Sequence, residues 1–272
     1  MLTYESLCSR NIGYIDPAIQ SKLRDTHILV AGCGIGSSFA ETAVRLGFEK
    51  LTLIDGDTVS ASNLNRQNFV AADIGTPKVD ALARRLLAIN PAAKIRALNA
   101  NVTPENAAEH VAEADLVFDT IDFLDLVGIV ALHDECRRLN KPAISALAIG
   151  WGAGCIYFPP DGHYSFRRIF GLQPDQDIRN ESYAATFIPL VQRIEKKLDP
   201  DVIRVLAQAL TVMEDGRPCP ASQVAPGASA VAALAGTLAI RIVAELPILA
   251  APNLLLADIP GILTTVSIDL TK

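Results

Sequence analysis

The chain has 272 residues, of which half are hydrophobic and 20% are charged. A composition this apolar excludes intrinsic disorder, because a chain of this length buries a large core when it folds. The net charge of −6 disfavours nucleic acid such as tRNA as a partner, unless a local basic patch attracts it.

The first part of the chain predicts a strand between two helices. Asp16 suits an N-cap and Pro17 suits a first helical turn, so a short helix is expected within the N-terminal arm. The apolar run at 27–31 is typical of a strand buried on both faces. A glycine-rich turn follows it, and 39–47 has helical periodicity.

The same alternation continues to residue 148. Further strands are predicted at 51–55, 94–100, 115–119 and 143–148, and further helices at 77–89, after the capping pair Thr103-Pro104, and at 124–139. Strands that alternate with helices predict an α/β fold, namely a Rossmann-like, doubly wound and mostly parallel sheet.

The alternation ends after residue 160. Residues 161–222 carry prolines, charges and one predicted helix at 201–213, so we expect an inserted lid or crossover segment. A mixed C-terminal part follows, with a long Ala-rich helix and two strand-like runs. We expect one domain over 1–272, divided into an arm and helix (1–25), a nucleotide-binding core (26–160), the insertion (161–222) and a C-terminal part (223–272). Within the C-terminal part, we expect a helix at 228–245 and strands at 253–258 and 263–269.

Membrane and disulfide signals are weak. The start of the chain lacks a signal-peptide pattern, and the longest apolar stretch, from Val224 to Leu249, contains Arg241 and Glu245. We expect a buried helix there, no membrane contact and a cytoplasmic location. No two cysteines form a C-x-x-C pair, so the cysteines predict neither a disulfide framework nor a zinc site. The five cysteines are Cys8, Cys33, Cys136, Cys155 and Cys219.

Gly32, Gly34 and Gly36 predict a phosphate-binding turn. They stand between a buried strand and a helix, where close backbone approach and the helix N-terminus favour an anion. Asp55 ends the next strand, where a carboxylate can accept hydrogen bonds from ribose hydroxyls. This pattern suits NAD as well as ATP, and a tight turn without a ligand stays an alternative, because Ser37 departs from the G-x-G-x-x-G spacing.

Polar residues are dense in the run DGDTVSASNLNRQNFVAADIGTPK, from Asp55 to Lys78. Asn63 and Arg66, three residues apart, lie on one face. A guanidinium fork and a lysine point charge suit a triphosphate better than the single pyrophosphate of a dinucleotide. Taken singly, such residues are more often surface or turn residues.

Asp122, in the run DTID after the fourth strand, is a candidate ligand for Mg²⁺ at the carboxyl edge of the sheet. Asp119 is the competing candidate. Capping of the following helix is the alternative role.

Together these segments resemble the adenylation core of the ThiF/MoeB/HesA family of ubiquitin-activating-type adenylyltransferases. The resemblance is close over 8–160 and looser over 219–268, and the NLNRQ-to-PK pairing is more specific than the glycines. It implies that ATP and Mg²⁺ bind. The paired zinc cysteines of many members are missing from this sequence, so no zinc is expected. The implied nucleotide site comprises the three glycines, Asp55 at the ribose, Asp57, and Asn63, Arg66, Gln67 and Lys78 around the phosphates, with Asp122 on magnesium.

Two further roles follow only from the resemblance. Arg10 would reach across a homodimer to the ATP of the partner, and Cys219 would take the acyl group as a thioester or enter sulfur chemistry. Ile35 replaces a glycine of the family and Phe123 replaces the asparagine of an Asp-Asn pair. These departures leave a divergent substrate or an inactive protein open.

The resemblance implies that a carboxylate attacks the α-phosphate of ATP. The expected acceptor is the C-terminus of a small ubiquitin-like or sulfur-carrier protein, or a peptide, docked under 161–222. Three alternatives stay open: an ATP-dependent dehydratase of a tRNA nucleoside, an NAD-dependent oxidoreductase, and a catalytically inactive partner-binding dimer.

Overall fold

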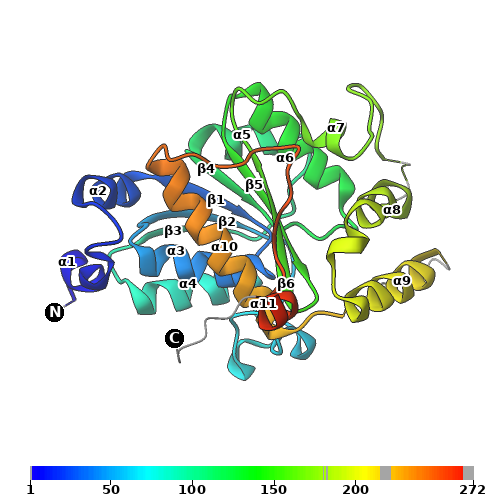
Figure 1. Cartoon of the computed structure of the whole chain (residues 1–272). Helices are drawn as coiled ribbons and strands as arrows, with labels where there is room; N and C mark the ends of the chain where they lie inside the picture. Colours follow the sequence, from blue (N-terminus) through cyan, green and yellow to red (C-terminus); the bar gives the residue numbers. More distant parts are fainter. Residues whose placement is uncertain (1, 180, 182, 215–221, 266–272) are drawn as a thin grey trace.

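The computed structural model of the protein describes residues 2–179, 181, 183–214 and 222–265. These residues form a seven-stranded sheet with helices on both faces (Figure 1). The strand order is β3-β2-β1-β4-β5-β6-β7, and β1 to β5 run parallel. The predicted Rossmann-like, doubly wound and mostly parallel sheet is confirmed.

The strands follow the apolar runs of the sequence. β5 and β6 are joined by a tight turn at Gly150 and Trp151, so β6 pairs antiparallel with β5, and β7 pairs antiparallel with β6. The bounds are β1 (His27–Ala31), β2 (Lys50–Ile54), β3 (Lys94–Leu98), β4 (Leu116–Asp119), β5 (Ala143–Ile149), β6 (Gly152–Phe158) and β7 (Leu255–Ala257).

Two hydrophobic cores lie on opposite faces of the sheet, because successive strand residues point to opposite sides. Ile28 and Val30 of β1 join one core, whereas Leu29 and Ala31 join the other. The first core packs against α3 (Gly36–Leu46), α4 (Lys78–Ile89) and α10 (Ala225–Val243). The second packs against α5 (Ala107–Glu113), α6 (Leu126–Arg138), α7 (Phe166–Ile169) and α8 (Tyr183–Ile194).

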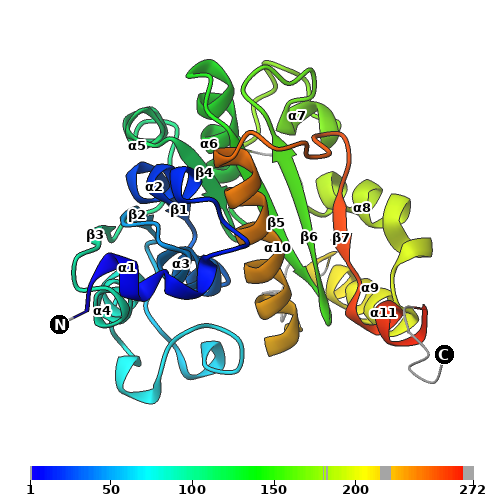
Figure 2. The same cartoon turned by 60° about the vertical axis from the view of Figure 1, so that its left-hand side comes forward.

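Helix α10 alone, among the described residues, is long and apolar enough to span a membrane. It lies across the sheet beside α3, next to β5 and β6 (Figure 2). Its small residues permit close approach: a Cβ on Gly236 would lie 3.0 Å from a methyl group of Thr42 in α3. The packing is that of a core helix, as the sequence predicted.

The remaining helices are α1 (Tyr4–Leu7) and α2 (Pro17–Asp25) in the arm, α9 (Pro200–Glu214) after residue 161, and α11 (Ile259–Thr265) near the end. The predictions of α2 and α9 are confirmed. The sequence pattern predicted neither α7 nor α8.

Two local predictions are wrong. The helix expected after Thr103-Pro104 begins only at Ala107, because the side chain of Asn106 accepts a hydrogen bond from the Thr103 N–H (2.8 Å) and holds 103–106 in a turn. The strand expected at 263–269 is helical over 263–265, at the end of α11. Pro260 in the first turn suits this helix, and 266–269 lie outside the described residues.

Candidate functional site

The candidate site lies where the strand order reverses, at the carboxyl ends of β1, β2 and β4. Open α/β sheets bind ligands at such a reversal, because the loops on its two sides diverge and leave a crevice. Three loops meet here: the glycine loop after β1, residues 55–77 after β2, and residues 120–125 after β4.

The glycine loop packs against Thr120. Gly32 has a φ of +87°, and a Cβ on it would collide with the carbonyl oxygen of Thr120. The Thr120 hydroxyl donates a hydrogen bond to the Gly32 carbonyl (2.8 Å), and a Cβ on Gly36 would lie 2.7 Å from that hydroxyl. These two glycines therefore allow the loop after β1 to close on the loop after β4.

Three consecutive N–H groups in this loop are available to a ligand. Within the described residues, the backbone N–H groups of Gly34, Ile35 and Gly36 have no acceptor. They open α3, whose N-terminus carries a partial positive charge. Unpaired N–H groups at a helix start are suited to an anion such as phosphate.

The carboxylate of Asp55 is held in place by two backbone N–H groups. Cys33 N–H donates to Oδ2 (2.6 Å) and Asp57 N–H donates to Oδ1 (2.8 Å). Burial raises the pKa of Asp55, while the Lys78 charge and these two hydrogen bonds oppose the rise. Asp55 thus joins the glycine loop to the loop after β2, with its lone pairs in a fixed orientation.

Cys33 itself is fully buried within this loop. Burial raises the pKa of its thiol well above the usual value, so the thiolate is disfavoured. Cys33 is therefore a packing residue of the core.

Lys78 is the buried cation of the site. Only 7% of the residue is exposed, and Nζ donates to Oδ2 of Asp57 at 2.7 Å. The Lys78 charge opposes the rise in pKa that burial gives Asp55 and Cys33. Asp57, which Lys78 contacts, also donates its backbone N–H to Asp55. Because the Asp57 side chain is 71% exposed, its carboxylate is screened by solvent and leaves the Lys78 charge available to an anion.

Arg66 is held in its own loop, next to the segment that leads into α10. Nε donates to the side-chain oxygen of Gln223, and Nη1 donates to the Ser62 carbonyl (2.8 Å) and to Asn65 Oδ1 (2.9 Å). Burial lowers the pKa of Arg66, and the charge of Asp122 opposes this. Nη2 has no partner in the described part of the chain and remains available. Sequence reasoning missed Gln223, which lies far from Arg66 along the chain.

Asn63 and Gln67 differ in what they do. Oδ1 of Asn63 accepts the Ser60 N–H (2.9 Å) and closes a short turn, which is the alternative role that the sequence left open. Gln67 is 8% exposed, and its Oε1 has no hydrogen-bond partner among the described residues. A Cβ on Gly34 would lie 3.1 Å from Nε2 of Gln67. An unsatisfied buried carboxamide beside the glycine loop supports a polar ligand there.

The structure separates the two candidate magnesium ligands. Asp119 is buried and accepts hydrogen bonds from His133, Ser145 (3.1 Å) and the Ile121 N–H (3.1 Å), so its oxygens are already used. The residue that caps α6 is Asp125, so neither Asp119 nor Asp122 has the capping role.

Asp122 is exposed, and its Oδ1 accepts the Leu124 N–H (3.0 Å). Within the described residues its Oδ2 is unpaired, and no cluster of three or more His, Cys, Asp or Glu side chains occurs. Mg²⁺ shared with a triphosphate needs only one or two protein carboxylates, so Asp122 is compatible with that ion.

Two predicted residues are not brought to this site. Arg10 is exposed at the other end of α3: its neighbour Asn11 donates to the Leu46 carbonyl (3.2 Å) at the helix C-terminus. Eleven helical residues span about 16 Å, so Arg10 does not contact the glycine loop of its own chain. Cys219 lies outside the described residues.

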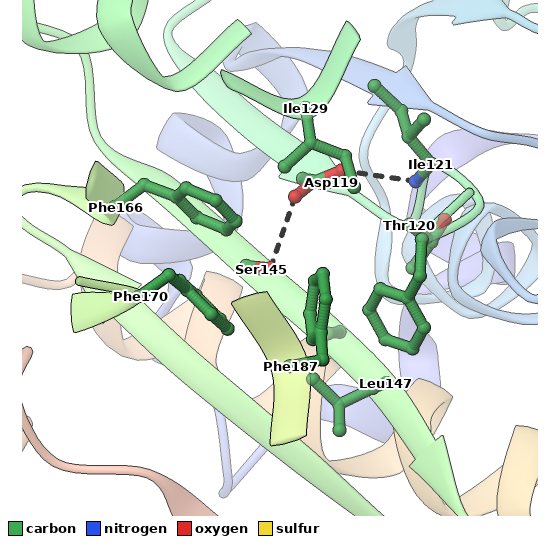
Figure 3. Close-up of a pocket in the computed structure, with 11 residues that line it drawn as sticks. Asp119, Thr120, Ile121, Ile129, Ser145, Leu147, Phe166, Phe170 and Phe187 are labelled. Carbon is green, nitrogen blue, oxygen red and sulfur yellow. Dashed lines mark hydrogen bonds between the residues drawn. The ribbon is translucent and has the colours of Figure 1, made fainter. Parts of the chain in front are cut away.

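An aromatic pocket, which the sequence did not predict, lies on the other side of β4 (Figure 3). Rings from α7 and α8 surround the hydrogen-bonded pair of Asp119 and Ser145. Phe123, beside the exposed Asp122, packs on Phe187 with ring centroids 4.6 Å apart. The lining residues are Asp119, Thr120, Ile121, Phe123, Ile129, Ser145, Ala146, Leu147, Phe166, Phe170 and Phe187.

Comparison with protein families shows which family the chain matches. The sequence model of the ThiF family matches residues 8–268, which is nearly the whole chain.

Among curated proteins, the chain is similar to the sulfur carrier protein ThiS adenylyltransferase of Escherichia coli K12. The two are 33% identical over 187 residues, which cover 67% of this chain and 74% of the relative. Identity to the molybdopterin-synthase adenylyltransferase of that organism is 34% over 158 residues (56% and 63%). Identity to its tRNA threonylcarbamoyladenosine dehydratase is 36% over 129 residues (46% and 47%). The chain thus matches less than two thirds of the length of the last two.

Solved structures show the same fold. The E. coli tRNA N6-threonylcarbamoyladenosine dehydratase in complex with ATP is 31% identical, with a TM-score of 0.51 over 54% of this chain and 61% of that one. PaaA (21% identity, TM-score 0.64, 89% and 72%) and E. coli MccB with AMPCPP and MccA (21%, 0.62, 89% and 61%) support the fold alone.

Proposed function

Because the chain belongs to the ThiF family, and is therefore an enzyme of the adenylyltransferase type, we propose that it transfers the adenylyl group of ATP to a carboxylate. One arrangement carries this proposal. The unpaired N–H groups of 34–36, the fixed carboxylate of Asp55 and the buried ammonium of Lys78 lie together at the reversal of strand order. An anion-binding helix start, a ribose acceptor and a cation match the parts of ATP.

In the proposed reaction, a carboxylate oxygen attacks the α-phosphorus of ATP. The bond from that phosphorus to the bridging oxygen breaks, pyrophosphate leaves with the electron pair, and an acyl adenylate forms. Asp55 would orient the ribose, while Lys78 and Nη2 of Arg66 would offset the growing phosphate charge. Asp122 would hold Mg²⁺, which supplies further positive charge to the phosphates.

We propose as acceptor the C-terminus of a small ubiquitin-like or sulfur-carrier protein, or a peptide. The support is the similarity to an enzyme named for the sulfur carrier protein ThiS. The same proposal includes four further features. The protein forms a homodimer in which Arg10 completes the site of the partner, and Cys219 forms a thioester. The protein is cytoplasmic, and residues 1–272 divide into arm, core, lid and C-terminal part.

A tRNA nucleoside carboxylate is the second candidate acceptor, since a curated relative is a tRNA threonylcarbamoyladenosine dehydratase. The net charge of −6 weighs against it. A gel shift of tRNA at several salt concentrations tests it, and tight binding at physiological salt would favour this acceptor.

Isothermal titration with ATP and with NAD tests the nucleotide. We expect ATP with Mg²⁺ to bind and NAD to bind weakly, because Lys78 and Arg66 suit a triphosphate. Binding of NAD without binding of ATP would overturn the proposal in favour of an oxidoreductase.

ATP–pyrophosphate exchange with Lys78→Met tests the chemistry. Methionine keeps the buried stem and removes the charge. We expect exchange to fall on the order of 100-fold, or about 3 kcal/mol of transition-state stabilisation. Lys50→Met is the matched control, since Lys50 pairs with Asp25 at the opposite end of β2. Equal exchange by both variants would contradict the proposed role of Lys78.

A further inference from the structure

We propose that Glu41 holds the three elements of the phosphate site in one fixed arrangement and thereby sets the affinity for ATP. Glu41 is a positioning residue, because it acts through other side chains and not on the nucleotide itself. This inference rests on the proposed function and adds a residue on which the nucleotide site depends.

The carboxylate of Glu41 joins two helices and a loop. The residue is only 9% exposed. On its own helix, α3, Nε and Nη2 of Arg45 donate to Oε1 (3.0 and 2.8 Å). Oε2 accepts from Nε of Arg85 in α4 and from Nδ2 of Asn68 (2.8 Å), in the loop after β2. Each oxygen thus accepts two hydrogen bonds, and the four donors come from three different elements.

Each of these elements carries part of the proposed phosphate site. The N–H groups of 34–36, which have no acceptor among the described residues, open α3, and Lys78 opens α4. Asn68 follows Arg66 by two residues in the loop after β2. Glu41 therefore bonds to the elements whose relative position decides whether the N–H groups, the ammonium and the guanidinium can contact one triphosphate.

Asn68 extends this contact to the glycine loop. Its Oδ1 accepts the Ser38 hydroxyl (2.8 Å), and its backbone N–H donates to Oγ of Ser37 (3.0 Å). The Ser37 hydroxyl in turn donates to the Gly34 carbonyl (2.6 Å). A continuous path of hydrogen bonds therefore runs from Glu41 through Asn68 to the turn that would hold phosphate.

The charges around Glu41 balance in favour of an anion. Burial disfavours the charged carboxylate, but hydrogen bonds from Arg85, Arg45 and Asn68 outweigh burial and lower the pKa of Glu41. Glu41 lies five residues after Gly36, about 7–8 Å along the helix axis, where a lone carboxylate would repel a triphosphate. Because the two guanidiniums exceed its charge by one, the cluster can position the site without opposing ATP.

Stability alone does not account for a carboxylate at this position. Desolvation offsets much of the attraction within a buried ion pair, so an apolar side chain of similar volume often gives equal stability. An apolar side chain would, however, give the Asn68 amide no acceptor and leave the loop without this bond to α3. Since misplacement by about 1 Å can lower an enzyme's rate on the order of 100-fold, the larger expected effect is on function.

Isothermal titration with ATP and Mg²⁺ tests the inference, because ATP binding needs no acceptor. Glu41→Gln keeps the shape of the side chain and removes its charge and half of its acceptor capacity. We expect the Kd for ATP to rise about tenfold, because the phosphate-binding groups lose their common arrangement.

Glu49→Gln is the matched control. Glu49 is also buried, with 7% exposed, and accepts hydrogen bonds from Arg24 (2.9 Å) and Asn90 (3.2 Å). It lies just before β2, at the end of the sheet opposite to the candidate site. We expect Glu49→Gln to lower the free energy of unfolding in urea as Glu41→Gln does, and to leave the Kd for ATP unchanged.

Asn68→Ala separates positioning from ion pairing. It keeps both arginine partners of Glu41 and frees only the loop, so it carries the test if Glu41→Gln does not fold. We expect Asn68→Ala to raise the Kd for ATP several-fold. In the double variant, the rise should be smaller than the product of the two single rises, because both changes break the same link.

Failure of the positioning role and failure of the proposed function give different results. If the unaltered protein binds ATP, and Glu41→Gln and Asn68→Ala bind it as tightly as Glu49→Gln does, Glu41 is only a structural residue and the proposed function stands. A double variant whose rise equals the product would mean that Glu41 does not act through Asn68, which also overturns the inference. If the unaltered protein does not bind ATP, both proposals fall.

Discussion

The two sides of the strand reversal are built by different interactions. On the β1 and β2 side, directed polar contacts fix single groups: two N–H donors hold Asp55, and Asp57 holds Lys78. On the β4 and β5 side, stacked rings fill a hollow around one satisfied carboxylate. The first side is suited to a ligand of fixed shape, such as ATP. The second side is held by ring packing, and it contains Phe123, a departure from the family pattern.

The largest expected effect tests how far ring packing supports the second side. Phe166 is 3% exposed and stacks on His133 and Phe170, with centroids 4.7 and 4.2 Å away. Phe166→Ala should lower the free energy of unfolding by about 3–5 kcal/mol. Phe123→Ala, at a partly exposed ring, should cost about 1 kcal/mol. Urea denaturation measures both, and equal losses would mean that Phe123 is as much a core residue as Phe166.

An intermediate effect asks whether the polar side is complete within one chain. Arg10→Ala should lower ATP–pyrophosphate exchange roughly 10- to 100-fold if its guanidinium reaches the partner's phosphates. Mixed with Lys78→Met, it should restore about a quarter of the activity, since random C2 pairing makes half the dimers mixed and each has one intact site. Mixing that restores nothing would place Arg10 outside the site of the partner.

The smallest effect is a pH dependence of stability in the acid range, which Asp55 on the polar side should produce. Burial raises the pKa of Asp55 above its unfolded value near 3.8. The folded state therefore binds more protons than the unfolded state between these two pKa values, and stability falls as pH rises through that window. Asp55→Asn should remove this fall. In Lys78→Met the fall should extend to higher pH, because the Lys78 charge no longer opposes the rise. Urea unfolding from pH 3.5 upwards measures it, and identical pH profiles for all three proteins would contradict the assignment to Asp55.

Sequence patterns were sufficient for one side of the site and insufficient for the other. The strands before the loops are continuous apolar runs, so their carboxyl ends, and with them Gly32, Asp55 and Asp122, could be placed from the sequence. Lys78 followed from a helix start. These are local signals, each within a few residues of the group that it places.

The aromatic side depends on contacts between distant segments. Phe123 and Phe187 are far apart in the chain, and α8 was not expected, because prolines and charges in 161–222 obscure its pattern. The late start of α5 is a smaller case, since Asn106 closes a turn that helix propensity alone does not reveal. Such features depend on packing between distant segments, and the pattern of a single sequence does not predict that packing.

The hydrogen bond from Arg66 to Gln223 joins the nucleotide loop to the chain just before α10, four residues after Cys219. If Nε of Arg66, as well as Nη2, turned to a phosphate, it would release the Gln223 amide, so nucleotide binding and the anchoring of Gln223 would compete for one side chain. By thermodynamic reciprocity, an acceptor that displaces Gln223 from Arg66 would raise the affinity for ATP, and bound ATP would make Gln223 easier to displace by the same free energy. The binding of ATP and the binding of the acceptor would then be coupled through a single hydrogen bond.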